Sequence, residues 1–360
     1  MPRRMGPDGS TTVLRMIGLT RKQVLGTLAV LVVLAGASVV VVKARSLEEA
    51  PQQQISTQGI ELAGCPTPSR YGTAPTAVAG TVQTYRLTAV PDNHAYDLRS
   101  ARVVGFPESS RYPLLFGKNR PGRSTCVVGG TVEGQQSRDL TWQTMKRVFD
   151  GDGLSIKSTA GVVDGIRIDN VQDGIGTIGG DPGGITIRNV YMTYIRDDCL
   201  ENDAIVQVTL RDSLLDGCYS AISERPGAGT TPPLPPPTET TTLDGVLIRL
   251  QPMPFNKERA TCPRNAADGL GHSGFFKWSR YANRLVVKDT VLLAERNSVN
   301  CGSSLNLPRS GSYDNVKLVW LGPGKYPGRV PGSGVTVTSD RGVWDRARAE
   351  WLTRHGYPTT

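Results

Sequence analysis

The sequence has no Cys-x-x-Cys pair and only three histidines among its 360 residues. Because closely spaced cysteines are the usual ligands of structural zinc, a zinc site is not expected. Helical periodicity is also scarce beyond residue 42, where short strands recur without helices between them. This pattern is not that of a sheet whose strands alternate with helices. The six cysteines all follow residue 42 and are even in number, which favours disulfides in an exported domain.

A strong excess of charge is absent from most of the chain. The formal net charge is +9, but residues 1–45 hold seven Lys or Arg against one Asp, and residues 46–360 hold thirty-four against thirty-one. The basic character therefore belongs mainly to the amino-terminal segment. It gives little support for nucleic-acid binding, and no nucleic-acid partner is expected.

The only long apolar run is Val24–Val42, which contains no charged residue. At 1.5 Å per residue it nearly spans a hydrocarbon layer of about 30 Å. Five basic residues precede it, namely Arg3, Arg4, Arg15, Arg21 and Lys22. This bias predicts a cytoplasmic tail (1–23), a transmembrane helix (24–42), a linker (43–64) and an extracytoplasmic domain (65–342) with a helical end (343–360). A cleaved signal peptide is the alternative, although the run exceeds the usual signal core.

The centre of the chain is repetitive. Alternating apolar residues at Ile166/Ile168, Ile185/Ile187 and Val208/Leu210 are each followed by Asn or Asp, at intervals of 19 and then 23 residues. Such units bury their apolar faces only when neighbours stack on them, so they predict a β-solenoid. The leucine spacing of leucine-rich repeats and the Asn-Gly turns of hairpins are absent. The amphipathic segment 343–356 is expected to cap an open end of the solenoid.

Two cysteines fall at matching places in adjacent units. Cys199 and Cys218 lie 19 residues apart, and stacked strands about 4.8 Å apart bring such residues within disulfide range. We therefore predict this disulfide, and the same alignment places Asp173, Asp197 and Asp216 in one column. The pairing of Cys65, Cys126, Cys262 and Cys301 stays open.

The segment DDCLEND (197–203) concentrates carboxylates more than any other stretch. Paired carboxylates can hydrolyse a glycosidic bond, one as an acid and the other activating water. A cluster of this kind could also bind calcium, which takes six to eight oxygen ligands.

The repetitive centre resembles the right-handed parallel β-helix proteins, the architecture of pectate lyases and polygalacturonases. Asp197-Asp198 resembles the Asp-Asp motif of polygalacturonase-type hydrolases, and Gly271-His272-Ser273-Gly274 resembles their Gly-His-Gly. The chain departs from the pattern because Asn170-Val171-Gln172-Asp173 replaces Asn-x-Asp, and no Arg-x-Lys motif follows the histidine. The resemblance implies an all-β, right-handed parallel β-helix that acts on a polysaccharide.

From these motifs we expect a membrane-anchored protein whose partner is a polysaccharide or cell-surface glycan. The candidate catalytic residues are Asp197, Asp198, Glu201 and His272, and the candidate substrate-binding residues are Asp173, Arg225 and Lys277. A paired-carboxylate glycoside hydrolase is the first hypothesis. The alternatives are a calcium-dependent polysaccharide lyase and a non-catalytic surface scaffold or glycan-binding protein. No cofactor is required by the hydrolase hypothesis, whereas calcium would belong to the lyase.

Overall fold

The computed structural model describes Cys65 and residues 75–105, 112–149, 151–178, 184–226 and 239–359. The predicted cytoplasmic tail, transmembrane segment and linker (1–64) lie outside these residues. Within the described ranges, no helix is both long and apolar enough to cross a membrane.

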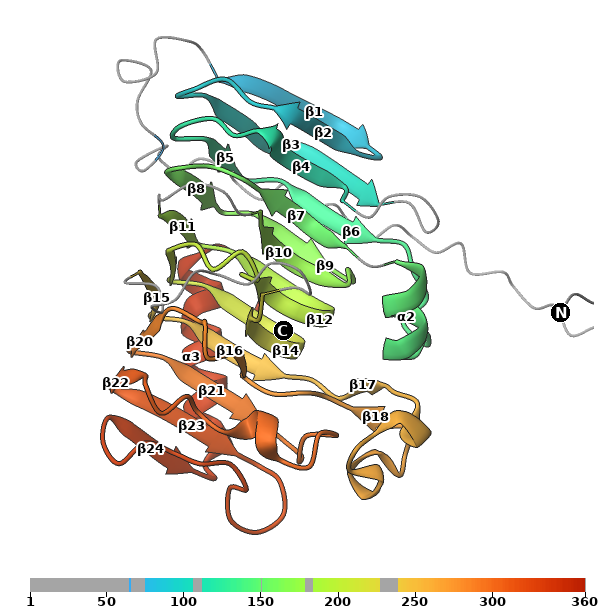
Figure 1. The fold of residues 1–360 in the computed structure, drawn as a ribbon, viewed down its shortest axis with the longest axis vertical. Coiled ribbons are helices and arrows are strands. Elements are labelled where there is room, and N and C mark those ends of the chain that lie inside the picture. The colour runs from blue at the N-terminus through green and yellow to red at the C-terminus, as the bar shows by residue number, and fades with distance from the viewer. Residues whose placement is uncertain are drawn as a thin grey trace, which may run out of the picture. The chain divides into compact units, whose positions relative to one another are not determined.

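The described chain is dominated by one sheet of 22 strands in which the pairings are parallel. The pairings form three ladders, to which successive coils of the chain add their strands (Figure 1). Ladder A contains the start of β3 (Ala95–Gly105), then β5 (Cys126–Val128), β8 (Gly161–Asp164), β11 (Ile185–Arg188), β13 (Val208–Arg211), β15 (Thr240–Asp244), β20 (Arg284–Lys288) and β22 (Ser312–Asp314).

Ladder B contains β1 (Thr76–Val82), the end of β3, β6 (Thr131–Gly134), β9 (Arg167–Asp169), the first halves of β12 (Tyr191–Glu201) and β14 (Leu214–Glu224), β16 (Leu247–Leu250), β21 (Val291–Ala294), β23 (Val316–Trp320) and β24 (Val335–Thr338). Ladder C contains β2 (Tyr85–Ala89), β4 (Leu114–Arg120), β7 (Asp152–Ile156), β10 (Asp173–Thr177), the second halves of β12 and β14, and β19 (Phe276–Trp278). The chain is thus an all-β parallel solenoid.

Apolar side chains fill the space between the ladders. Ile168, Ile187 and Leu210, which belong to the repeats identified in the sequence, are at most 1% exposed. The predicted interval of 19 residues is wrong, however, because Ile168 pairs with Met192 in ladder B whereas Ile187 pairs with Val163 and Leu210 in ladder A. Both ladders carry the same apolar alternation, and sequence alone does not separate them.

The turn that follows each strand of ladder A explains the recurring Asn and Asp residues. Successive coils place a residue with positive φ there, in the order Gly165, Asn189, Asp212, Gly245, Asp289 and Asn315. Glycine, asparagine and aspartate adopt this left-handed conformation at least cost. The backbone N–H of Asn189 donates to the carbonyl of Asp212 (3.1 Å), so the turns also bond from coil to coil.

The predicted Cys199–Cys218 disulfide is confirmed, with a Cα–Cα distance of 5.7 Å. Cys65–Cys126 and Cys262–Cys301 form two further disulfides. The register inferred from the cysteines is wrong, because Cys218 lies opposite Ile195 and an irregularity follows before Asp198 pairs with Ser220. Asp216 consequently lies in ladder B, where its carboxylate bonds Arg249 (2.5 Å) and Arg348 (2.7 Å).

Removing the Cys199–Cys218 disulfide is expected to destabilise the protein. In the chain-entropy model, a loop of this length contributes about 3 kcal/mol by restricting the unfolded chain. A Cys199→Ala/Cys218→Ala variant should therefore unfold at lower denaturant concentration, measured against a wild type that is kept oxidised. An unchanged midpoint, or a free Cys199 thiol in the native protein, would contradict this prediction.

Two α-helices lie in the described part. Helix α3 (Arg341–Arg354) was expected to cap an end of the solenoid, but it packs along the side of ladder B. Its Trp344, Trp351 and Leu352 cover outward-facing residues of several coils, including Tyr191 and Leu214. Those residues are apolar, so a lateral position buries more surface than the terminal strand alone would offer. Helix α2 (Trp142–Val148) connects ladder B to ladder C between β6 and β7.

Candidate functional site

Acidic side chains gather on ladder C. Asp173 of β10 lies opposite Asp152 of β7, and the backbone N–H of Asp198 in β12 donates to Asp173 Oδ1 (2.9 Å). Gly176 has no Cβ in the space where the Asp152 carboxylate lies. The column expected to hold Asp173, Asp197 and Asp216 therefore consists of Asp152, Asp173 and Asp198.

Two lysines hold the Asp197-Asp198 pair. Lys277 of β19 places Nζ 2.5 Å from Asp197 Oδ1 and 2.9 Å from the Asp198 carboxylate. Lys146 of α2 places Nζ 3.1 Å from Asp197 Oδ2. Asp197 and Asp198 are only 1% and 2% exposed, so solvent screens these ion pairs weakly. Each oxygen of Asp197 thus has its own cationic partner.

The environments of the two aspartates push their pKa values apart. Burial raises the pKa of Asp197, but the charges of Lys277 and then Lys146 outweigh it and leave the pKa below its ordinary value. Burial raises the pKa of Asp198 to about 6, opposed by Lys277 and assisted by repulsion from Asp197. Adjacent carboxyls of this kind can serve as a proton donor and a proton acceptor.

The pKa values of two further acids beside this pair are also raised. Burial, Asp152 and Asp198 raise the pKa of Glu201 to about 9. Burial and the negative charge of Glu201 raise the pKa of Asp173 well above its ordinary range. Glu201 is consequently neutral near pH 7 and adds no further negative charge beside the Asp197-Asp198 pair.

Part of this cluster could offer oxygens to calcium, but a lysine already occupies the rest. Two overlapping triplets, Asp152/Asp173/Glu201 and Asp173/Asp197/Asp198, have carboxylate oxygens within 4.8 Å of one another. Calcium takes six to eight oxygens, so each triplet of carboxylates would need bidentate binding or water ligands to complete its coordination. In the second triplet, two of the three already pair with Lys277.

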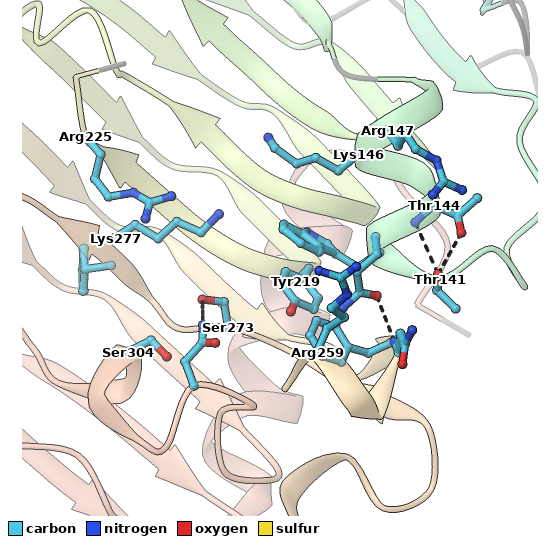
Figure 2. A pocket seen from close by; sticks show the side chains of 16 residues that line it. Thr141, Thr144, Lys146, Arg147, Tyr219, Arg225, Arg259, Ser273, Lys277 and Ser304 are labelled. Carbon is cyan, nitrogen blue, oxygen red and sulfur yellow. Dashed lines mark hydrogen bonds between the residues drawn. The ribbon is translucent and has the colours of Figure 1, made fainter. Parts of the chain in front are cut away.

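A cleft of about 870 Å³ lies over the acidic pair. Figure 2 shows Lys146 and Lys277 reaching into it from α2 and β19, with Arg225 beside Lys277 and Arg147 and Arg259 on the opposite side. These five cations are among the residues that line the cleft, and the lining contains no Asp or Glu. Arg147, Arg225 and Arg259 are exposed, and within the described part of the chain their guanidinium groups bond no other side chain. The cleft is thus strongly cationic.

Aromatic rings form one wall of the cleft. Trp142, Tyr219 and Phe255 lie nearly parallel, with the Trp142 and Tyr219 centroids 5.5 Å apart and those of Tyr219 and Phe255 6.0 Å apart. Tyr219 also lies near the acids, since burial and the charges of Asp197 and Asp198 raise its pKa. Tyr219 and Phe255 are 3% and 6% exposed and stack on each other, so the half-buried Trp142 is the ring of this wall that can present a face to a sugar, next to cations that can bind acidic substituents.

The residues expected from the sequence occupy different places. Lys277 and Arg225 line the cleft, whereas Asp197 and Asp198 lie buried beneath it and Glu201 is not among the lining residues. His272 was a candidate catalytic residue, but its side chain is fully buried and outside the lining, with Nδ1 2.9 Å from the carbonyl oxygen of Ser273. Burial lowers the pKa of His272 to about 4, so it is neutral at physiological pH.

Sequence reasoning missed Lys146 and the aromatic wall. The helix that carries Lys146 has one local signal, the N-cap at Thr141, whose Oγ1 accepts from Thr144 N (3.3 Å). A single short helix of this kind does not reveal a partner 51 residues away.

We compared the chain with protein-family models, curated proteins and solved structures, and none of them matched. The fold and the site therefore rest on the chain's own geometry.

Proposed function

We propose that this protein is a right-handed parallel β-helix enzyme of the pectin-lyase-like type that hydrolyses an acidic polysaccharide. The observation that carries the proposal is a pair of carboxyls with separated pKa values beneath a cationic, aromatic cleft. Right-handedness is supported by the general preference for right-handed connections between parallel strands. The substrate class is supported by five cations and no acid among the lining residues.

Cleavage begins when Lys277 leaves its two aspartate partners and binds an anionic group of the substrate. In the free protein its ammonium binds Asp197 and Asp198, and one of its three N–H donors remains for a substrate anion. As Lys277 turns toward the substrate, Asp198 loses its cation, so its pKa rises above about 6 and it takes up a proton from solvent. Asp198 then donates that proton to the glycosidic oxygen as the bond to the anomeric carbon breaks. Asp197, still bound by Lys146, accepts a proton from the attacking water.

A non-catalytic glycan-binding protein is the second candidate, favoured by the 1–2% exposure of Asp197 and Asp198. Such a protein would use the same cations and aromatic rings to bind the polymer. It would leave the carboxylates as permanent partners of the two lysines, so binding would occur without cleavage.

The cellular setting is part of the proposal. We place the solenoid outside the cell, attached by the segment Val24–Val42, because the segment is apolar and uncharged and the basic residues precede it. The three disulfides of the described part are in keeping with an oxidising compartment. An anchored enzyme of this kind would act on polymers at the cell surface.

A panel of acidic and neutral polysaccharides tests the proposal. Incubation of the full chain with each polymer should release new reducing ends from uronate-containing polymers, without the ultraviolet absorption of unsaturated sugars. Ultraviolet-absorbing products would indicate a lyase instead. Retention of acidic polymers without new ends would support the glycan-binding candidate.

A further inference from the structure

Helix α2 interrupts the regular passage of the chain from ladder B to ladder C. Its seven residues lie between β6 and β7 and contact β12, the strand that carries Asp197 (Figure 1). The helix also supplies part of the cleft wall through Trp142, Gln143, Thr144, Lys146 and Arg147. It is therefore an addition to the solenoid that faces the acidic pair.

The residue before Asp197 anchors the segment that leads into α2. Arg196 is 1% exposed, and its guanidinium donates to the carbonyls of Ser137 (3.3 Å), Arg138 (3.4 Å) and Leu140. The Tyr194 hydroxyl donates to the same Arg138 carbonyl (2.7 Å). Strand β12 thus fixes the start of α2 through Tyr194 and Arg196, which precede Asp197 and Asp198 in the same strand.

The helix is also held on its other sides. Met145 is 1% exposed, and the backbone N–H of Asn256 donates to Gln143 Oε1 (2.9 Å). The side chain of Lys146 is 40% exposed but ends 3.1 Å from Asp197 Oδ2. A long, mobile side chain reaches a single buried oxygen here because the helix beneath it is fixed on several sides.

We infer that Lys146 is a positioning residue that, together with Lys277, holds the Asp197 carboxylate ionised and in one orientation. Lys277 occupies Oδ1 and Lys146 occupies Oδ2. When the substrate draws Lys277 away, Lys146 remains as the cation that keeps Asp197 able to accept a proton. The role assigned to Lys146 rests on the proposed function, but the ion pair itself can be tested without activity.

Several charged or titratable groups face Asp197, and the test must take them into account. Lys277 comes from β19, Tyr219 from β14, Asp198 from β12 and Asp173 from β10. Lys146 is the second cation beside Asp197, and it comes from helix α2 rather than from a strand of ladder C. Replacing Lys146 therefore removes one positive charge and leaves the strands of ladder C unchanged.

The variant Lys146→Met is expected to shift the acid limb of the pH–rate profile to higher pH. Asp197 must be ionised to accept a proton, and weaker charge stabilisation raises its pKa, so kcat/KM should fall about tenfold on the acid side and less at the optimum. Lys146→Arg should restore the profile, because it restores the charge. Lys288→Met, which removes an exposed lysine on ladder A, should leave it unchanged.

A second readout separates this inference from the proposed function. In the full chain labelled with ¹³C at aspartate carboxyls, the Asp197 resonance, identified by its loss in Asp197→Asn, should titrate at higher pH in Lys146→Met than in wild type. An unchanged titration overturns the inference even if the protein cleaves glycans. A shifted titration supports the ion pair even if no glycan is cleaved. The absence of cleavage would defeat the proposed function but not the ion pair.

Discussion

Replacing Asp198 with asparagine should reduce glycan cleavage by about 10²–10⁴-fold, the usual cost of losing a general acid. Asparagine has nearly the same size and cannot donate the proton that Asp198, with a pKa of about 6, can supply. Lys277 keeps its contact with Asp197 in this variant, so no buried charge loses its last partner. The melting temperature should therefore change little. Reducing ends released by the full chain and a thermal scan measure the two effects.

Asp244→Asn is the matched control for this prediction. Asp244 is an exposed aspartate on β15 of ladder A and does not line the cleft. It should retain full activity. If Asp198→Asn and Asp244→Asn cleave equally well, Asp198 is not the acid. If Asp198→Asn unfolds at a much lower temperature, its carboxylate has a structural role in the solenoid.

Replacing Lys277 with methionine should cost about 3–5 kcal/mol of stability, because removing one partner from a buried ion pair leaves uncompensated charge. Lys277 is 10% exposed along its side chain and neutralises two aspartates that are nearly inaccessible to solvent. Those aspartates raise the pKa of Lys277 above its ordinary value despite its burial, so it is charged at neutral pH. Denaturant unfolding of the full chain measures the loss.

The pH dependence of that loss identifies its cause. Without Lys277 the pKa of Asp198 lies above its wild-type value of about 6, so the variant takes up a proton there while wild type is still ionised. The difference from wild type should therefore shrink as the pH falls toward about 6. Adding Asp198→Asn to Lys277→Met should recover part of the stability, since it removes the same charge by mutation. A loss that is equal at pH 5 and pH 8, with no recovery in the double variant, would mean that Lys277 contributes mainly through packing.

The sequence predicted the parallel solenoid because the features that specify it are local. Apolar residues at alternate positions, and Asn or Asp at turns such as Asn189 and Asp212, are determined within a single strand and its turn. The Cys199–Cys218 pairing was also accessible, since adjacent coils fix the distance between its ends.

The register and the site were less accessible because they depend on contacts between distant segments. The irregularity between Ile195 and Asp198 shifts the pairing within β12, and no residue type marks it in the sequence. Lys277 meets Asp197 across 80 residues, and Lys146 meets it across 51. His272 follows the motif of a catalytic histidine, yet its ring is buried in the interior, with Nδ1 2.9 Å from the carbonyl oxygen of Ser273.

Cleavage of one polymer before and after reduction of its carboxyl groups tests the central claim most directly. The full chain should release reducing ends from a uronate polysaccharide. The rate on the same polymer with its carboxylates converted to alcohols should be at least about tenfold lower, since a hydrogen bond to a charged group contributes roughly 1.5–3 kcal/mol. Equal rates on the two polymers, or no reducing ends from any acidic polysaccharide, would contradict a cationic cleft that hydrolyses acidic glycans through Asp197 and Asp198.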